Sequence, residues 1–173
     1  MHLHISMQDA AGRNVFVEAV EGQWSDTIKH AIGGLRATMG ESMLVFAPHA
    51  NSWRRFASNS YAPVSPTWGV NNRSVALRIP AGDIKARRVE HRPAGVDANP
   101  YLVAATVLAG MRYGFKHQID DRHVGRRHAD RVGGELPFKL RADLRHGLRG
   151  ARFCNHHIHR GAAPAALLLV VVV

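Results

Sequence analysis

The stretch K-A-R-R-V-E-H-R at residues 85–92 decides how the rest of this chain is interpreted. A β-branched valine lies at its centre and a turn-forming P-A-G precedes it, which is typical of a β-strand. Because strand side chains alternate between the two faces of a sheet, Arg88, Glu90 and Arg92 are expected on one face and the residues between them on the other. That face would carry one carboxylate between two guanidinium groups.

The chain has 173 residues and a single cysteine, Cys154. This length favours one domain, or one domain with a tail. A single cysteine excludes an internal disulfide and fits a reducing compartment, so we expect a cytoplasmic protein. The opening M-H-L-H-I-S lacks the basic and apolar segments of a signal peptide. The final A-A-L-L-L-V-V-V-V is about half a membrane span, which favours a sticky apolar end over an anchor, and we expect no membrane partner.

The formal net charge of +10 suggests an anionic partner such as nucleic acid. The charge is unevenly distributed. Residues 1–115 carry 12 Lys/Arg against 8 Asp/Glu, whereas residues 116–173 carry 11 against 5, together with seven of the twelve histidines. Hydrophobic periodicity also fades after about Lys116. We therefore expect one folded unit over residues 1–118 and a basic, Arg/His-rich segment of doubtful structure over residues 119–173.

Periodicity and turn residues predict the secondary structure. Ser25 is a plausible N-cap for a helix that Gly40 closes, and Asn99 with Pro100 at the first helical position begins another. The apolar stripe of this second helix would be Leu102, Val103, Thr106, Leu108 and Met111. The expected strands are residues 2–6, 14–20, 74–79 and 85–92, of which the first two would form a hairpin, and a long polar loop would cover residues 48–72.

Two small clusters could carry chemistry. His2, His4 and Ser6 would share one face of the first strand, where paired imidazoles can bind a metal or a phosphate; the alternative is a polar stripe facing solvent. In the loop, Arg54 and Arg55 lie beside aromatic residues in N-S-W-R-R-F and could grip a carboxylate or phosphate with two hydrogen bonds. The alternative is that these are ordinary surface arginines.

The largest cluster combines the opening strand with the one before it. Arg73 and Arg78 would lie beside Arg88, Glu90 and Arg92 on neighbouring strands. Such a set suits a polyphosphate with a divalent cation, because arginines neutralise phosphate oxygens while a carboxylate holds a metal that bridges them. The alternative is a solvated face of charged residues.

At these residues the chain resembles a known family. M-H-L-H-I-S, N-S-W-R-R-F, Y-A-P, W-G-V-N-N-R, A-L-R-I-P, A-R-R-V-E-H-R and D-A-N-P-Y-L follow one another at spacings that resemble the C-terminal half of the glutamine synthetase catalytic domain. The resemblance covers roughly residues 1–118. It implies an ATP-dependent ligase that phosphorylates the side-chain carboxylate of glutamate and then lets ammonia or an amine displace the phosphate, with Mg²⁺ or Mn²⁺ holding the phosphates.

The resemblance also implies roles for individual residues. His2 and Glu90 match metal ligands of the family. Positions that bind the nucleotide and its phosphates correspond to His4, Ser6, Arg73, Arg78 and Arg88.

Substrate roles follow from the same motifs. Arg55 matches an arginine that binds glutamate near the transferred phosphate, and Arg92 matches one that contacts both. With Arg73 they are the expected catalytic arginines. Tyr61 stands where the ammonia-using enzymes have a glutamate, and this resembles the branch that makes γ-glutamylpolyamines and γ-glutamylputrescine. An organic amine is therefore the expected nucleophile.

For the architecture we expect an α+β fold, a curved antiparallel sheet with helices packed on one face. The family's upstream metal-binding glutamates are absent, and the run after about His146 resembles nothing in the family. We therefore expect a fragment that begins at an internal Met, ends out of frame and is inactive alone, although family members are homo-oligomers. A different interpretation is a basic nucleic-acid-binding or phosphate-binding protein acting through residues 119–173. H-H-x-H in this segment could bind Zn²⁺, but it lacks a second ligand cluster, which favours incidental composition.

Overall fold

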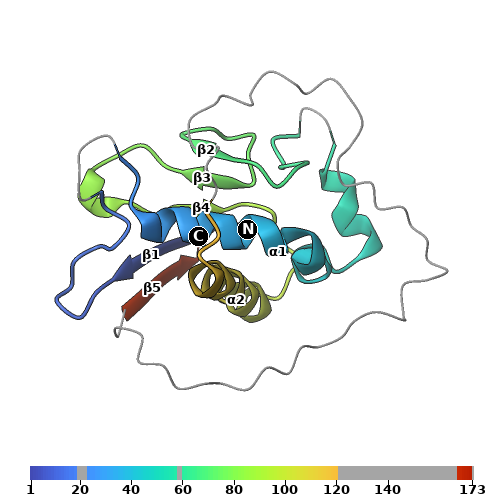
Figure 1. Ribbon diagram of the computed structural model, residues 1–173. Helices are drawn as coiled ribbons and strands as arrows, with labels where there is room; N and C mark the ends of the chain where they lie inside the picture. The colour runs from blue at the N-terminus through green and yellow to red at the C-terminus, as the bar shows by residue number, and fades with distance from the viewer. Residues whose placement is uncertain (19–22, 58–59, 121–166, 173) are drawn as a thin grey trace, which may run out of the picture.

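The computed structural model describes residues 1–18, 23–57 and 60–120 and the backbone of residues 167–172. It has an α+β fold in which two long helices lie against one face of a sheet (Figure 1). The strand order is β2-β3-β4-β1-β5. The strands are β1 (Leu3–Gln8), β2 (Trp68–Val70), β3 (Leu77–Ile79), β4 (Val89–His91) and β5 (Leu167–Val172).

The sheet is antiparallel, as expected, at every pair except one. β1 runs antiparallel to both β4 and β5, and β3 runs antiparallel to β4. β2 and β3 pair in parallel, because the connection from Asn71 to Ala76 carries the chain back before β3 begins. Asn71 adopts a positive φ of 49° at the start of this connection, a conformation that asparagine tolerates better than most residues.

The core lies between the sheet and helix α1 (Asp26–Phe46) together with helix α2 (Pro100–His117). Leu3 and Ile5 of β1 are fully buried there, while His2 and His4 on the opposite face are only partly buried. This confirms the predicted alternation of the first strand.

The start of α1 is as predicted, but its end is not. The Ser25 hydroxyl accepts a hydrogen bond from the amide of Ile28, which makes it the N-cap. The helix passes through Gly40 and ends at Phe46. Gly40 is exposed and Met43 and Phe46 are buried, so the apolar stripe continues beyond the glycine and its burial outweighs the glycine's low helix propensity.

Helix α2 begins as predicted but faces the core with a different stripe. The Asn99 side chain caps the amides of Tyr101 and Leu102, and Pro100 follows it in the first turn. The prediction that Leu102 lies on the buried stripe is wrong, since 57% of it is exposed. The buried residues are Val103, Val107, Gly110, Met111 and Gly114.

The predicted hairpin reduces to one β-bridge between Gln8 and Asn14 among the described residues. The Asn14 side-chain amide donates to the carbonyl oxygens of Lys85 and Arg87 at 3.0 and 2.8 Å. The segment after the turn is thus tied to the approach to β4, and it does not extend a ladder along β1. Residues 19–20, the end of the predicted second strand, lie outside the described residues.

The predicted central strands and the predicted middle loop are longer than the observed ones. Only Leu77–Ile79 and Val89–His91 of the two predicted central strands pair in the sheet. A short 3₁₀ helix, η2 (Ile84–Ala86), occupies the first part of the opening stretch, and Asp83 caps it. The long middle loop contains β2 and a second 3₁₀ helix, η1 (Ala50–Arg55). The predicted tail over residues 119–173 lies outside the described residues except for residues 119–120 and the backbone of β5.

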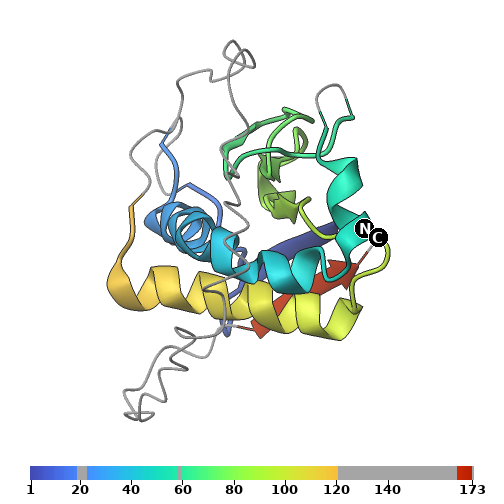
Figure 2. The ribbon, with the colours of Figure 1, turned by 90° about the vertical axis from the view of Figure 1, so that its right-hand side faces the viewer.

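The two helices touch at glycines. In Figure 2, α1 and α2 lie side by side in opposite chain directions. A Cβ atom built on Gly34 would collide with the carbonyl oxygen of Gly110 and the backbone of Gly114. A Cβ on Gly114 would collide with the carbonyl oxygen of His30. None of the helices within the described residues is long and apolar enough to cross a membrane.

We predict that Gly34→Ala destabilises the chain by at least about 1–3 kcal/mol, because the added methyl meets backbone atoms that cannot move aside without separating the helices. Gly40→Ala is the matched control: it lies in the same helix, nothing would lie within 4 Å of its Cβ, and it should stabilise by about 0.5–1 kcal/mol. Urea unfolding measures both. Equal effects of the two substitutions would contradict the close helix contact.

Candidate functional site

A buried carboxylate lies at the centre of the charged cluster. Glu90 is only 2% exposed, although it lies on the sheet face opposite the helices. Its Oε2 lies 3.0 Å from Nη1 of Arg78, and its Oε1 lies 3.5 Å from Nη1 of Arg92. Nδ1 of His2 lies 3.2 Å from Oε1. The alternative of a solvated face is therefore wrong for Glu90 and Arg92, which are both buried.

Strand register aligns these residues. Arg78 of β3 and His4 of β1 are the Cα partners of Glu90 on its two sides. Directly opposed residues of antiparallel strands project their side chains from the same face. The sequence folds in this way because the alternate residues of the same strands, such as Leu3, Leu77 and Val89, are apolar and face the core.

Arg88 and His4 form a second contact on this face. Nε of Arg88 lies 3.2 Å from Nδ1 of His4, and its Nη1 donates to the carbonyl of Ala86 at 3.3 Å. Ser6 lies two residues beyond His4 on the same side of β1 and is partly buried. The structure thus brings the three predicted nucleotide-site residues Arg88, His4 and Ser6 to one side of Glu90.

Arg55 and Arg92 lie on the other side. Arg92 Nη2 donates to the carbonyl of Tyr61 at 3.2 Å. Nη2 of Arg55 donates to the carbonyl oxygens of Pro93 and, at 3.4 Å, of Arg92. The Arg55 guanidinium also lies 4.6 Å from the centre of the Phe56 ring. Burial lowers the pKa of both arginines, with nearby charges of each sign contributing less.

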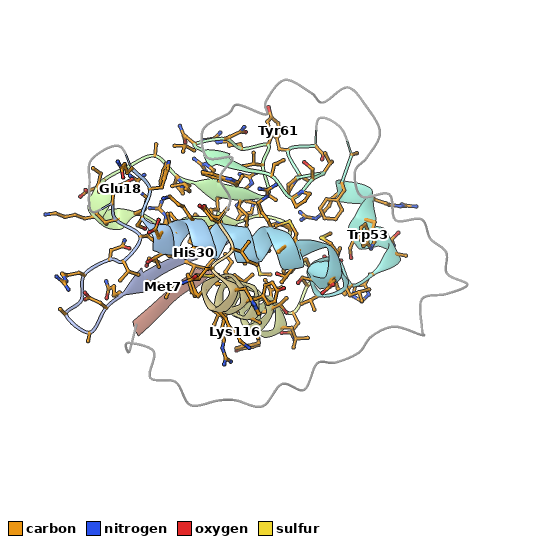
Figure 3. The ribbon with its side chains drawn as sticks, viewed as in Figure 1. Met7, Glu18, His30, Trp53, Tyr61 and Lys116 are labelled. Atoms are coloured by element: carbon orange, nitrogen blue, oxygen red, sulfur yellow. The ribbon has the colours of Figure 1, made fainter. Side chains whose placement is uncertain are left out.

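The other predicted residues of the site are exposed. Tyr61 is 74% exposed, and Figure 3 shows its side chain pointing away from the body of the molecule above β2 and β3. It meets Arg92 through its backbone carbonyl, and its φ of 56° is unusual for a tyrosine. Arg73 is exposed and contributes a positive potential at Arg92. Arg54 is exposed on η1, as the surface alternative predicted.

The histidines of the site are shifted toward the neutral form. Desolvation and then the charge of Arg92 lower the pKa of His2, against an opposing effect of Glu90. Desolvation is likewise the main cause that lowers the pKa of His4. A neutral imidazole is the form that binds a metal ion or accepts a hydrogen bond. Both histidines are thus suited to act as ligands near neutral pH.

The described residues supply only part of a metal site. His2 and Glu90 converge, but no group of three or more His, Cys, Asp or Glu that could hold a metal occurs within the described residues. Mg²⁺ commonly takes one or two protein carboxylates and completes its shell with water and phosphate oxygens. Because both Glu90 oxygens already face guanidinium groups, a cation fits here only together with an anion that the arginines share. H-H-x-H of the tail lies outside the described residues.

Two features of the site were not foreseen from sequence. Oδ1 of Asn71 accepts from Nη2 of Arg78 at 2.9 Å and so fixes the direction of that guanidinium. The Ser52 hydroxyl donates to the Asp97 carboxylate and thereby joins η1 to the segment after β4. The N-N pair of W-G-V-N-N-R could have signalled the first, since asparagine pairs favour such turns. The second joins residues that are 45 positions apart.

A family model described as "Glutamine synthetase, catalytic domain" matches residues 1–130. The chain belongs to the glutamine synthetase family. Among curated relatives, γ-glutamylputrescine synthetase PuuA of Escherichia coli is 41% identical over 180 residues, which cover 97% of this chain and 37% of that protein. γ-Glutamylethanolamide synthetase of Streptomyces coelicolor is 39% identical over 119 residues, 69% of this chain and 25% of that protein. This glutamine synthetase homologue thus spans between 25% and 37% of the length of these relatives.

Solved structures agree with the family assignment. GmaS without ligand superposes with a TM-score of 0.58 and 36% identity, over 69% of this chain and 27% of that one. GmaS in complex with ADP gives a TM-score of 0.59 and 34% identity, over 69% and 28%. The relatives named in the comparisons are ligases, so the comparisons give no support to the interpretation as a nucleic-acid-binding protein.

We predict that acid destabilises the fold through His91. This imidazole is 1% exposed, packs 4.5 Å from the Phe46 ring between centroids, and has its pKa lowered by burial to about 3. The unfolded chain therefore binds a proton below about pH 6.5 that the folded chain takes up only near pH 3. The contribution of His91 to the free energy of unfolding is fully present above pH 6.5. It is lost by up to about 5 kcal/mol as the pH drops to 3.

His91→Leu should remove this part of the pH dependence. The difference in unfolding free energy between wild type and variant, followed by urea titration from pH 7 to pH 4, isolates the contribution of His91. His117→Leu, at the exposed end of α2, is the control and should follow the wild type. A His91→Leu curve parallel to that of the wild type would show that the imidazole titrates freely in the folded chain.

Proposed function

We propose that this chain carries the phosphate-binding part of an ATP-dependent ligase that joins glutamate to an amine. The observation that carries the proposal is the burial of Glu90 between Arg78 and Arg92, beside His2, on the sheet face away from the core. A buried cluster with three cationic or cation-binding groups around one carboxylate suits a polyphosphate better than a surface salt bridge does. Family membership and the ligase names of the relatives support it.

In this proposal, different arginines bind different phosphate groups. Arg78 and Arg88 would face the nucleotide phosphates together with Arg73, and His4 and Ser6 would line the nucleotide site. Arg92 and Arg55 would meet the phosphoryl group as it passes from ATP to the side-chain carboxylate of glutamate. The reaction builds up negative charge on phosphate oxygens, so cations already held in place lower its barrier without further rearrangement.

Glu90 and His2 would hold a divalent cation, Mg²⁺ or Mn²⁺. When bound, such an ion would neutralise phosphate charge that the arginines leave uncovered. The chain's own contribution is to keep the Glu90 carboxylate oriented through Arg78 and the His2 imidazole neutral through partial burial. Because the described residues offer two such ligands, we expect ATP and metal binding to be weak in this chain and activity alone to be negligible.

The amine is proposed to be an organic one, and the site to be completed in a cytoplasmic homo-oligomer. Tyr61 brings an exposed aromatic ring to the edge of the site where the ammonia-using enzymes have a carboxylate. An aromatic face can bind a cationic amine and its alkyl part, whereas a bare ammonium ion gains more from a carboxylate. The names of the relatives include putrescine, ethanolamine and isopropylamine ligation.

We predict that Arg88→Ala weakens ATP binding about ten- to hundredfold, because a hydrogen bond to a charged group contributes about 1.5–3 kcal/mol. Glu90→Gln should instead abolish the strengthening of ATP binding by Mn²⁺. Calorimetric titration with ATP, with and without Mn²⁺, measures both. Arg112→Ala, exposed on α2, is the charge-matched control. Arginine variants on the site and on α2 that weaken ATP binding equally would overturn the proposed nucleotide site.

The nucleophile can be tested in a chimera. Residues 1–118 would replace the corresponding segment of the Escherichia coli relative, which supplies the rest of the protein. We expect turnover with putrescine to exceed turnover with ammonium, and Tyr61→Glu to raise the ammonium rate relative to the putrescine rate. Release of phosphate at saturating glutamate measures both rates. A chimera that uses ammonium as fast as any amine would contradict the organic amine.

A further inference from the structure

Ser52 and Asp97 join two segments that the proposed function uses but does not explain. Ser52 is 5% exposed in the middle of η1, and its hydroxyl accepts from the amide of His49 at 3.0 Å while it donates to the Asp97 carboxylate. Asp97 lies between β4 and α2, in the coil that Figure 2 shows beside η1. One hydroxyl therefore closes the first turn of η1 and fastens that turn to the neighbouring segment.

The backbone beneath Asp97 is shaped for this contact. A Cβ atom on Gly95 would overlap the Asp97 carboxylate, so only glycine leaves room for the carboxylate to fold back toward Ser52. The Gly95 amide donates to the carbonyl of Phe46 at 2.9 Å, which anchors the coil to the end of α1. The hydrogen bond from Ser52 is the main cause that lowers the pKa of Asp97, so the carboxylate is ionised at neutral pH.

Arg55 follows Ser52 by one turn of η1. Residues three apart in a 3₁₀ helix lie on the same side, so both side chains face the coil after β4. Ser52 reaches Asp97 while Arg55 reaches the carbonyls of Arg92 and Pro93. These two contacts hold one turn of η1 against the coil, one at each end of the turn. The contact of Arg55 places its guanidinium against the backbone of Arg92.

The Arg55 guanidinium lies against the backbone of Arg92 and is also within range of the charge on the Arg92 side chain. The charge of Arg92 lowers the pKa of Arg55, and the charge of Asp97 acts in the opposite direction on the same group. Glu90 has the equivalent effect on Arg92. The charge of Asp97 therefore favours the charged form of Arg55, as that of Glu90 does for Arg92.

We propose that Ser52 and Asp97 are positioning residues that hold Arg55 beside Arg92, so that the two guanidinium groups form one preassembled binding end for a phosphoryl group. This inference rests on the proposed function of Arg55 and Arg92 as phosphate-binding residues. It adds the pair that keeps them in place before any ligand arrives. Preassembly matters because cations already in place need no reorganisation when phosphate charge develops.

The first test needs no ligand. The buried Nε of Arg55 should give a protected N–H signal in a ¹⁵N-edited NMR spectrum at low temperature, identified by its loss in Arg55→Lys. Ser52→Ala should broaden or shift this signal toward that of an exposed arginine, while Ser52→Thr, which keeps a hydroxyl, should retain it. An unchanged Arg55 signal in Ser52→Ala would overturn the proposal whatever the chain binds.

The second test is a double-mutant cycle with inorganic pyrophosphate as the probe. Ser52→Ala should weaken pyrophosphate binding about tenfold and Ser52→Thr less than about twofold. In an Arg55→Met background, Ser52→Ala should have no further effect, because its role passes through Arg55. If Ser52→Ala weakens pyrophosphate binding just as much in the Arg55→Met background, Ser52 has a general structural role. That result would refute its role in positioning Arg55.

Asp97→Ala removes the same hydrogen bond from the exposed side, where no cavity forms, and provides the comparison should Ser52→Ala fail to fold. Pyrophosphate binding by this variant is measured at about 1 M salt. At that concentration electrostatic effects are screened beyond about 3 Å, so loss of the Asp97 charge contributes little by itself. It should reproduce the weakening, and undiminished binding would count against the pair. If Arg55→Met itself leaves pyrophosphate binding unchanged, the proposed function of Arg55 is wrong, and the NMR result still decides the positioning of its side chain.

Discussion

The structure depends on one buried carboxylate. Glu90 is almost inaccessible, and its two oxygens contact Arg78, Arg92 and His2. A buried charge is tolerated only when it is paired, and removing one member leaves the others without compensation. The three strands that supply these residues must therefore keep their register, because a shift of one residue would turn each side chain to the opposite face. The same contacts thus serve the fold and the proposed site.

The two faces of the sheet have opposite roles that come from one alternating pattern. Apolar residues face α1 and α2 and form the core, while the charged row lies on the other side. The two helices pack closely against each other because glycines of α1 and α2 let their backbones come into contact. The helices pack closely behind the short central strands, and on the far side Arg78 and Arg92 are held by their contacts with Glu90. The proposed phosphate site requires cations held in place in this way.

Much of the site could be predicted because it follows strand periodicity. The alternation in β4 placed Glu90 and Arg92 on one face, and the two caps, Ser25 and Asn99, marked both helix starts. Boundaries failed where longer-range contacts decided them. α1 continues past Gly40 because its later residues are buried, and the predicted hairpin is limited to one bridge because Asn14 bonds to the approach of β4. Neither partner is visible in a local window of sequence.

The sequence by itself determined the family, the residue types of the site and their order along the strands, since these depend on motifs and on the two-residue period of a strand. The tertiary structure decided which charges are buried, that Tyr61 meets Arg92 through its backbone, and that Ser52 joins Asp97. Burial and pairing depend on segments that are far apart in the chain, and their energies arise only when those segments exclude water together. The spacing of residues along the sequence does not show which distant segments will bury one another.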